Sequence, residues 1–297
     1  MMRAMFAAIS GMATNQTMLD VAANDLANVN TIGFKGSRAT FKDSLSQLTA
    51  GGTAAAGTSS GSNPEQVGLG VSLGSIDSQM SGGAVQSTGN PLDVSVQGDG
   101  WFRLGTGSPT PGNPVAGVPT GQLLSYTRAG NFSRNDAGYL TESGSYVLGR
   151  TQAGGGQDCF INIPSGATDV SIGEDGSVSF LPPTGFTQPA SLPPIDATGR
   201  AIAGYIALSK FPNENGLQRA SGNRWTANQA SGVETVNTPG QGGGTFGSTV
   251  AGTLEMSNVD LATEFTNLIT AQRAYQANTK VVSTGDEMLQ DLVNLKH

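Results

Sequence analysis

The sequence predicts an α+β protein: discontinuous helices at the two ends of the chain pair with each other, and the segment between them forms an antiparallel, glycine-rich β domain. Apolar residues recur at steps of three and four along both ends, which is the spacing of one stripe on an α-helix. All 14 prolines lie between Pro64 and Pro239, and proline is poorly tolerated inside helices. The 43 glycines and the charged fraction of only 12% suit many turns and short strands in the middle.

The first predicted helix runs from about Ala4 to about Val29. It is expected to end before Asn30–Gly33, because Asn and Gly readily adopt the left-handed conformation that closes a helix. One mainly apolar stripe follows its length and is predicted to be the packing seam. The stripe consists of Met5, Ile9, Met12, Gln16, Leu19, Ala23 and Leu26.

The second predicted helix begins after the capping residues Ser257–Asp260 and extends nearly to His297, on the order of 55 Å. Its stripe keeps the same rhythm, although Asp286 interrupts it. A sustained stripe requires a partner helix, so residues 1–33 with 255–297 are predicted to form a coiled-coil-like inner domain. The second seam consists of Leu261, Phe265, Leu268, Gln272, Tyr275, Thr279, Val282, Leu289 and Val293, with Ile269 beside it.

Residues 66–240 are predicted to form the β domain. Val67, Leu69, Val71 and Leu73 alternate with small or polar residues, which is the period of a half-buried strand. Turn motifs such as Gly98–Gly100 then separate short strands. Proline- and glycine-rich stretches at 105–121 and 181–199 are predicted to be long surface loops. Residues 34–65 with 241–254 are predicted to be flexible connecting segments, because 44–62 is rich in small residues and has no periodicity.

Both predicted helices carry few charges. A helix pair exposed to water usually has outer faces rich in Lys and Glu, whereas Asn, Gln, Thr and Ala dominate here. This composition favours contact with further protein on several sides; the alternative is a helical hairpin packed on its own β domain. Gly11 and Gly285 each cost roughly 1 kcal/mol relative to Ala, which indicates either close backbone approach or tolerated drift. Gln16 and Gln272 form either a buried register pair or a solvent-exposed edge.

The residues that carry chemistry argue against an enzyme. The only histidine is His297, which excludes a histidine-based triad or a multi-histidine metal site within this chain. Glu174–Asp175 precedes a glycine and is interpreted as a turn, with a hydrolase using paired acids as the alternative. A net charge of −7 offers no basic surface to nucleic acid, and no apolar run is long enough to span a membrane. We therefore expect no cofactor, metal, small-molecule ligand, nucleic acid or membrane insertion.

The single cysteine and the two tryptophans leave two further interpretations open. Cys159 shares a predicted strand face with Ile161 and Ile163, so it is either a buried small hydrophobe or a reactive thiol. A β-rich adhesin would be expected to expose an aromatic binding face, but Trp101 and Trp225 stand alone in the sequence. An adhesin or carbohydrate-binding module is therefore the weaker alternative to a structural protein.

Two terminal blocks resemble the signature of bacterial flagellar rod and hook proteins. The first spans residues 19–35, and the second combines residues 254–261 with 271–278. Further blocks at 66–70, 88–93, 98–102 and 126–132 are similar to family blocks in the same order, whereas 105–121 and 181–199 are not covered. The residues carried over as the family signature are Asn24, Asn28, Asn30, Gly33, Phe34, Lys35, Asn258 and Arg273.

The resemblance implies a non-enzymatic subunit that polymerises into a tube, with the terminal helices inside and the β domain outside. Residues 63–70 and 286–296 look more like a hook protein than a distal rod protein, so the hook, a flexible torque-transmitting joint, is the expected function and the distal rod the alternative. The implied partners are other copies of the chain, the distal rod, the hook–filament junction, the hook cap and the type III export apparatus. The implied location is the flagellum, reached without a cleaved signal peptide, and residues 44–62 are expected to let the β domain shift as the tube bends.

Overall fold

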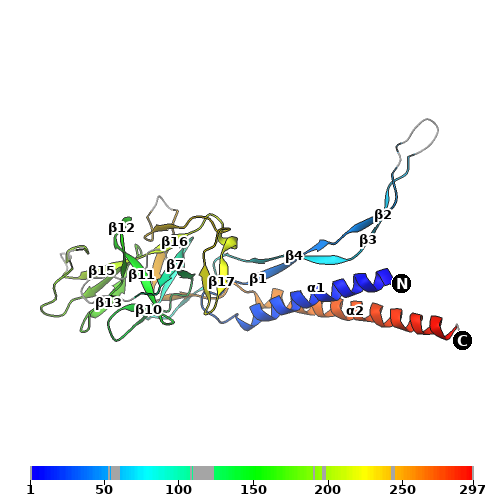
Figure 1. Cartoon of the computed structure of the whole chain (residues 1–297). Helices are drawn as coiled ribbons and strands as arrows, with labels where there is room; N and C mark the ends of the chain where they lie inside the picture. The colour runs from blue at the N-terminus through cyan, green and yellow to red at the C-terminus, as the bar shows by residue number, and fades with distance from the viewer. Residues whose placement is uncertain are drawn as a thin grey trace. The chain divides into compact units, whose positions relative to one another are not determined.

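The computed structural model describes residues 2–52, 54, 61–107, 109, 124–189, 191–195, 199–241 and 245–295. Its helices at the two ends contact each other and its middle is antiparallel sheet, so the predicted α+β fold class is confirmed (Figure 1). Contacts divide the chain into two compact units. We call Met1–Asn28, Gly36–Gln79 and Val259–His297 the helical unit, and Val29–Lys35 with Met80–Asn258 the β unit.

The first helix, α1 (Met2–Ala27), ends two residues earlier than the sequence predicts. The last turn is completed by asparagine side chains, since Asn28 Nδ2 donates to the Asn24 carbonyl oxygen at 2.9 Å. Gly33 has a φ of +65°, so its predicted left-handed conformation is present. It lies several residues beyond the end of α1, however, and it belongs to the β unit instead of capping the helix.

The second helix, α2 (Leu261–Asn294), begins where the capping residues predict. Asp260 is the N-cap, and its carboxylate accepts hydrogen bonds from the Ala262 backbone N–H at 3.2 Å and from the Thr263 hydroxyl at 2.6 Å. These bonds satisfy a backbone donor that the first helical turn otherwise leaves unpaired. Neither described helix combines the length and the apolarity needed to cross a membrane.

A two-stranded ribbon, residues 37–78, completes the helical unit. Strand β1 (Ser37–Asp43) pairs antiparallel with β4 (Val71–Ser78), and β2 (Ser46–Ala50) pairs with β3 (Glu65–Gly68). Figure 1 shows β1 and β4 running alongside α1, with which both strands are in contact. The structure therefore differs from the predicted unstructured segment: 46–50 is a strand, because small polar residues can pair through the backbone without an apolar period. Residues 53 and 55–60 of that segment lie outside the described part.

The β unit is built mainly on one 13-stranded antiparallel sheet, counted over the described residues. Its longest path runs in the order β13-β14-β15-β11-β7-β8-β18-β17. A short 3-10 helix, η1, covers Glu214–Gly216. The strands of the unit are β5 (Val85–Ser87), β6 (Val94–Gln97), β7 (Trp101–Gly105), β8 (Ser125–Thr127), β9 (Ser133–Arg134), β10 (Leu140–Glu142), β11 (Ser145–Gln152), β12 (Gly155–Phe160), β13 (Thr168–Ile172), β14 (Ser177–Leu181), β15 (Ala201–Ile206), β16 (Leu208–Lys210), β17 (Gln218–Ala220), β18 (Arg224–Thr226), β19 (Thr235–Asn237), β20 (Ser248–Ala251) and β21 (Thr253–Glu255).

Two of these strands lie in the second segment predicted to be a flexible connection, 241–254. β20 pairs with β6, and β21 pairs with β5. The strands of this segment form by pairing with β5 and β6, which are far away in the sequence. Local composition does not contain this information, and the glycine-rich start of the segment therefore suggests a flexible linker. Of the predicted surface loops, most of 105–121 lies outside the described residues, and 182–189 contains no helix or strand.

The core of the β unit consists of closely packed aromatic and aliphatic clusters. Trp101 and Trp225 are buried and meet edge to face, with ring centroids 5.8 Å apart, beside Tyr126 and Phe211. A larger cluster around Phe102 and residues of β6, β11, β14 and β15 fills the space behind them. The tryptophans are thus core residues, which removes the exposed aromatic face that an adhesin would need.

Candidate subunit interface and signature cluster

The paired helices approach each other closely at two glycines, and methionines of α1 also contact α2. Ala8 and Gly11 of α1 and Ala271 and Gly285 of α2 are buried. A Cβ added at Gly11 would lie 2.7 Å from Asn278 Nδ2, and one added at Gly285 would lie 3.1 Å from the Met5 sulfur. Both helical glycines therefore lie where the helices approach closely, which explains why glycine is present there although it lowers helix stability relative to alanine.

The predicted seams coincide only in part with the face that one chain buries. Of the five buried positions of α1, Ala8, Gly11, Ala22 and Asp25 each lie one residue before a predicted seam residue, and Thr14 lies two residues before Gln16. Two residues of the predicted seam do meet α2: a Cβ at Gly285 would lie 3.1 Å from the Met5 sulfur, and the Met12 sulfur accepts a 3.4 Å hydrogen bond from the Thr279 hydroxyl. The predicted residues Met5, Met12, Leu19, Leu26, Leu268, Val282 and Leu289 are half-buried, whereas Ile9, Gln16, Leu261, Phe265, Ile269, Gln272, Tyr275 and Val293 are exposed.

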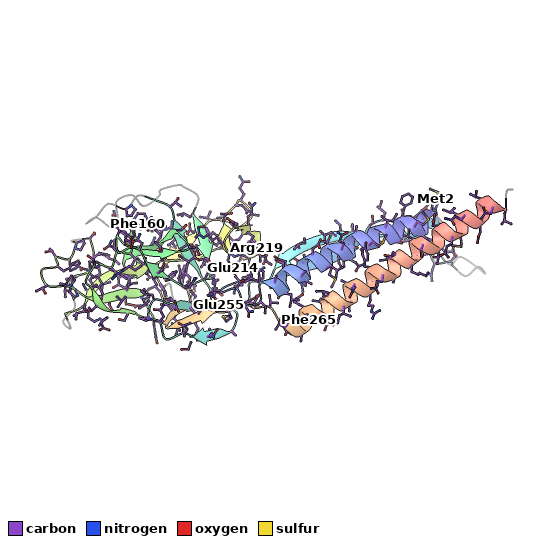
Figure 2. The ribbon with its side chains drawn as sticks, turned by 90° about the horizontal axis from the view of Figure 1, so that it is seen from below. Met2, Phe160, Glu214, Arg219, Glu255 and Phe265 are labelled. Carbon is purple, nitrogen blue, oxygen red and sulfur yellow. The ribbon has the colours of Figure 1, made fainter. Side chains whose placement is uncertain are left out.

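Gln16 and Gln272 are both exposed, so the solvent-edge interpretation holds for them within one chain and the buried register pair does not. The exposed large apolar side chains of the two helices say more about a candidate interface. Figure 2 shows Met2 near the free end of α1 and Phe265 on the side of α2 that faces away from α1. The helices leave many large apolar side chains uncovered, so their exposed surface is a candidate interface with further protein.

The ribbon extends the apolar surface of the helical unit. Every residue of β2 and β3 is exposed. A two-stranded ribbon is at best marginally stable in water without a further layer, so one side of it is expected to be covered by protein. Its exposed large apolar residues are Phe41, Leu45, Leu48, Val67, Leu69, Leu73 and Ile76.

The signature residues near the end of α1 divide between surface and buried positions. Asn24 is exposed and Asn28 is half-buried, and they bond to each other as described above. The neighbouring Asp25, which the sequence analysis does not single out, is buried, and its Oδ2 accepts a 2.7 Å hydrogen bond from the Ser37 backbone N–H. An aspartate among the small residues Ala22 and Gly11 of one helix face could have indicated a buried, hydrogen-bonded carboxylate at this position. Asn30 and Arg273 are exposed.

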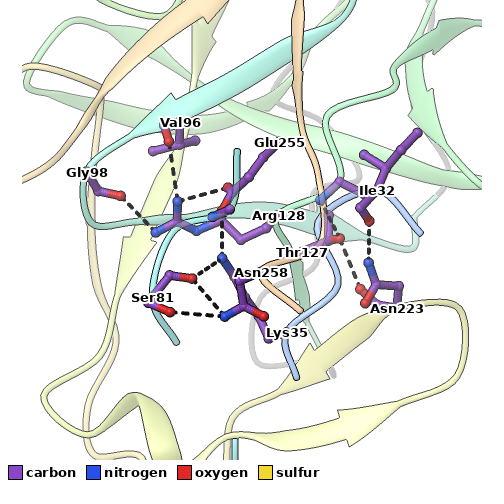
Figure 3. A network of polar contacts seen from close by, with 12 residues as sticks. Ile32, Lys35, Ser81, Val96, Gly98, Thr127, Arg128, Asn223, Glu255 and Asn258 are labelled. Carbon is purple, nitrogen blue, oxygen red and sulfur yellow. Dashed lines mark hydrogen bonds and ion pairs between the residues drawn. The ribbon is translucent and has the colours of Figure 1, made fainter. Parts of the chain in front are cut away.

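Lys35 is the centre of a buried polar cluster in the β unit (Figure 3). Its side chain is fully buried, and its Nζ donates to Glu255 Oε1 at 2.6 Å and to the Ser81 carbonyl oxygen at 2.8 Å. Burial lowers the pKa of Lys35 from its usual value, and the negative charge of Glu255 opposes that shift. The ion pair and the hydrogen bonds that the ammonium donates are what a buried ammonium requires.

Glu255 and Arg128 complete this cluster, and neither is in the predicted set. Glu255 Oε1 also accepts from the Gly83 backbone N–H at 2.9 Å, and Oε2 lies 3.3 Å from Arg128 Nη1. Arg128 Nη2 donates to the Gly98 carbonyl oxygen at 2.8 Å, and its guanidinium lies 5.5 Å from the centroid of the Trp101 ring. Lys35 and Glu255 are 220 positions apart, so no local pattern relates them.

The signature residues Gly33 and Phe34 fit this cluster sterically. A Cβ at Gly33 would lie 2.6 Å from the Ala129 backbone nitrogen, and the Gly33 N–H donates to the Glu255 carbonyl oxygen at 2.8 Å. Only glycine fits this positive-φ position. Phe34 is buried, and the guanidinium of Arg219 lies 4.6 Å from its ring centroid.

The signature residue Asn258 links the carboxyl-terminal side to the same cluster. Its Nδ2 donates to the carbonyl and hydroxyl oxygens of Ser81, each at 3.1 Å, and its backbone N–H donates to the Phe34 carbonyl oxygen at 3.4 Å. On the other side, Asn223 Nδ2 donates to the Ile32 carbonyl oxygen at 2.6 Å. The structure thus brings together Gly33, Phe34, Lys35 and Asn258, and it leaves Asn24, Asn28, Asn30 and Arg273 outside the cluster.

The remaining chemical candidates are structural. Asp175 Oδ1 accepts hydrogen bonds from the backbone N–H and the hydroxyl of Ser177, as in an Asx turn, and Gly176 follows with a φ of +76°. Cys159 is buried, and its burial raises the pKa of the thiol to about 12. Over the described ranges, no three His, Cys, Asp or Glu side chains are grouped to hold a metal ion.

Comparison with known proteins identifies the family. Profiles described as "Flagella basal body rod protein", "Flagellar hook protein FlgE/F/G D1 domain" and "Flagellar basal body rod FlgEFG protein C-terminal" match residues 5–35, 95–180 and 250–295. The flagellar basal-body rod protein FlgG of Bacillus subtilis is 45% identical over 298 residues and covers all of both chains. FlgG of Caulobacter vibrioides is 38% identical over 301 residues, 99% of this chain and 100% of the relative. The chain belongs to the FlgG family of flagellar basal-body rod proteins.

The expected hook function is therefore wrong. The flagellar hook protein FlgE of Treponema pallidum is only 25% identical, and its alignment needs 465 residues to cover both chains, against 298 for the Bacillus subtilis rod protein. Residues 63–70 and 286–296, which favoured a hook protein, were misleading, and the terminal signature blocks could not decide because rod and hook proteins share them, as the joint FlgE/F/G descriptions indicate. The FlgG family consists of structural axial proteins of the flagellar basal-body rod, not enzymes, and membership implies polymerisation with other axial proteins.

Proposed function

We propose that this chain is the subunit of the distal rod, a stiff tube that it builds by self-association through the helical unit. The observation that supports this most is that large apolar residues on both helices remain exposed although the helices already contact each other. Ile269 is 56% exposed and Phe265 is 50% exposed in the single chain. Covering such side chains contributes roughly 25 cal/mol per Å² of apolar surface removed from water.

The contact is expected to be heterologous, joining different surfaces of successive copies. A heterologous contact that does not close into a ring generates a helical filament. On α2, Tyr275, Gln276, Thr279, Lys280 and Ser283 line a shallow groove, and Thr279 also donates to the Met12 sulfur of α1. This groove suits an apolar side chain from the helix of a second copy.

The ribbon has a different role in a rod from the one expected for a hook. Its apolar residues and its strand pairing suit a fixed contact between neighbouring copies, whereas a bending joint would need an unpaired connection. Adjacent axial proteins at each end of the rod are the further partners of the same surface. Export by the flagellar type III apparatus without a cleaved signal is part of this proposal.

Substitution of the exposed helix face tests self-association. Ile269→Asp and Leu268→Asp are expected to prevent rod assembly, because a carboxylate in a desolvated helix contact costs several kcal/mol. Thr270→Asp, one position further along α2 and also exposed, is the matched control and is expected to assemble. Normal rods from the Ile269→Asp chain, seen by electron microscopy of isolated basal bodies, would refute the proposed interface.

Immunogold labelling of isolated hook–basal bodies tests the location along the axis. Label is expected on the rod segment next to the hook and absent from the hook itself. Label along the length of the hook, or only at the cytoplasmic end of the rod, would contradict the distal-rod assignment.

A further inference from the structure

The chain passes between its two units four times. The links lie between residues 28 and 29, 35 and 36, 79 and 80, and 258 and 259. A structural subunit that carries load must hold such links where they leave the fold, because one peptide segment released from its unit no longer transmits force. The contacts of the β-unit residues next to these links decide how they are held.

Three of the four links lie beside residues that belong to one hydrogen-bonded group around the buried Lys35–Glu255 pair. Lys35 is itself the last residue before the second link, and Ser81 and Gly83 follow the third link directly. Asn258 is the last residue before the fourth link, and Glu255 lies three positions upstream.

The hydrogen bonds of this group connect residues next to the second, third and fourth links with one another (Figure 3). The Lys35 ammonium binds Glu255 and the Ser81 carbonyl, Glu255 Oε1 accepts from the Gly83 N–H, and Asn258 binds Ser81. The Gly33 N–H and the Asn258 N–H donate to carbonyl oxygens across the cluster, as described above.

The Lys210–Asp99 ion pair of the same unit is solvent-exposed and can be compared with the buried Lys35–Glu255 ion pair. Their Nζ–Oδ2 distance is 2.7 Å, close to that of the Lys35–Glu255 pair, but both side chains remain substantially in solvent. Water can replace either partner there, so the pair adds little to stability. At Lys35 and Glu255 the side chains are 0% and 3% exposed, so loss of one partner leaves the other buried without its countercharge.

We propose that the Lys35–Glu255 pair is a clamp that joins the second, third and fourth links, so that the β unit releases these three segments together or not at all. Arg128 is the positioning residue of the clamp, because it binds the second oxygen of Glu255 while its guanidinium is held by the Gly98 carbonyl. The proposal goes beyond self-association, since it concerns each single subunit before assembly.

Hydrogen exchange of the full-length chain, followed by mass spectrometry, tests the clamp. The reporters are the backbone amides of Gly33, Gly83 and Asn258, whose acceptors are all in the cluster. In Lys35→Met, all three reporter segments are expected to exchange at least about tenfold faster, while β7 keeps its protection. Lys210→Met is the matched control and is expected to change exchange at these reporters by less than about twofold.

Glu255→Gln is the second variant, because it keeps the side-chain volume and removes only the charge. It is expected to accelerate the same three segments as Lys35→Met. Faster exchange confined to the segment around the substituted residue, with the other two unchanged, would overturn the clamp. Loss of protection in β7 in both variants would also overturn it, since the pair would then belong to the global core.

Discussion

The two units of this chain treat their aromatic residues in opposite ways. In the β unit, Trp101 and Phe102 are fully buried within clusters that one chain completes by itself. In the helical unit, Phe6 is 64% exposed and Phe265 is 50% exposed, and the buried positions of α1 are taken by alanine, glycine, threonine and one aspartate. Both units are poor in charge, so the difference does not come from composition alone.

This difference shows that a chain can fold one core completely and leave another open. The β unit has the cooperative interior of an independent domain, whereas the helical unit has packed two helices and a ribbon without covering its largest apolar side chains. The closed core supplies stability to the subunit. The open one supplies surface for neighbours, which is what a subunit of a polymer requires.

Truncating one phenylalanine in each unit gives the largest effect that tests this comparison. Phe102→Ala is expected to lower the free energy of unfolding of the β unit by about 3–5 kcal/mol, because it leaves a cavity in a closed core. Phe41→Ala, at an exposed position of the ribbon, is expected to change the free energy of unfolding of the helical unit by less than about 0.5 kcal/mol. Denaturant unfolding of the unassembled full-length chain measures both, and equal losses would mean that the helical unit is as closed as the β unit.

Thiol reactivity gives a second comparison of the two units. Because burial raises the pKa of Cys159 from 9.0 to about 12, its thiolate fraction near neutral pH falls about a thousandfold. Cys159 is therefore expected to react with a thiol reagent that much more slowly than a cysteine introduced on α2 as Thr270→Cys in a Cys159→Ser background. Comparable rates for the two thiols, measured under native conditions, would show that the core around Cys159 opens readily.

The smallest expected effect concerns acid and the start of α2. The pKa of the Asp260 carboxyl is lowered from its usual value, mainly by the hydrogen bond from the Thr263 hydroxyl and further by the Ala262 backbone N–H. Its stabilising contribution is therefore fully present above its unfolded pKa and is lost as the pH falls through the lower folded value.

Asp260→Asn tests this contribution, because it keeps a capping side chain and removes the titration. Helix content of assembled rods, measured by circular dichroism during acid titration, is expected to fall at a higher pH in the original chain than in Asp260→Asn, because protonation weakens only the aspartate cap. Superimposable titrations would exclude Asp260 as a contributor.

Much of the fold follows from local sequence. The stripes and the absence of proline predict both helices, and α2 begins at its predicted cap because Asp260 and the first helical turn interact over three residues. The turn at Glu174–Gly176 is likewise set by neighbouring residues, since Asp175 bonds two positions along the chain. The antiparallel β class follows from alternation and frequent turn motifs. These features depend on interactions that a short window of sequence contains.

Tertiary structure decided the features that depend on distant residues. It ordered 46–50 and 248–251 as strands, because their partners lie elsewhere in the chain and pair through the backbone. It decided which positions of α1 are buried, since Gly11 lies against Asn278 of α2 and Asp25 is bonded to Ser37 of the ribbon. It also placed Lys35 against Glu255, 220 positions away, where burial makes the pair necessary. Periodicity records which residues are apolar, but only the folded chain determines which of them are covered and which remain for a partner.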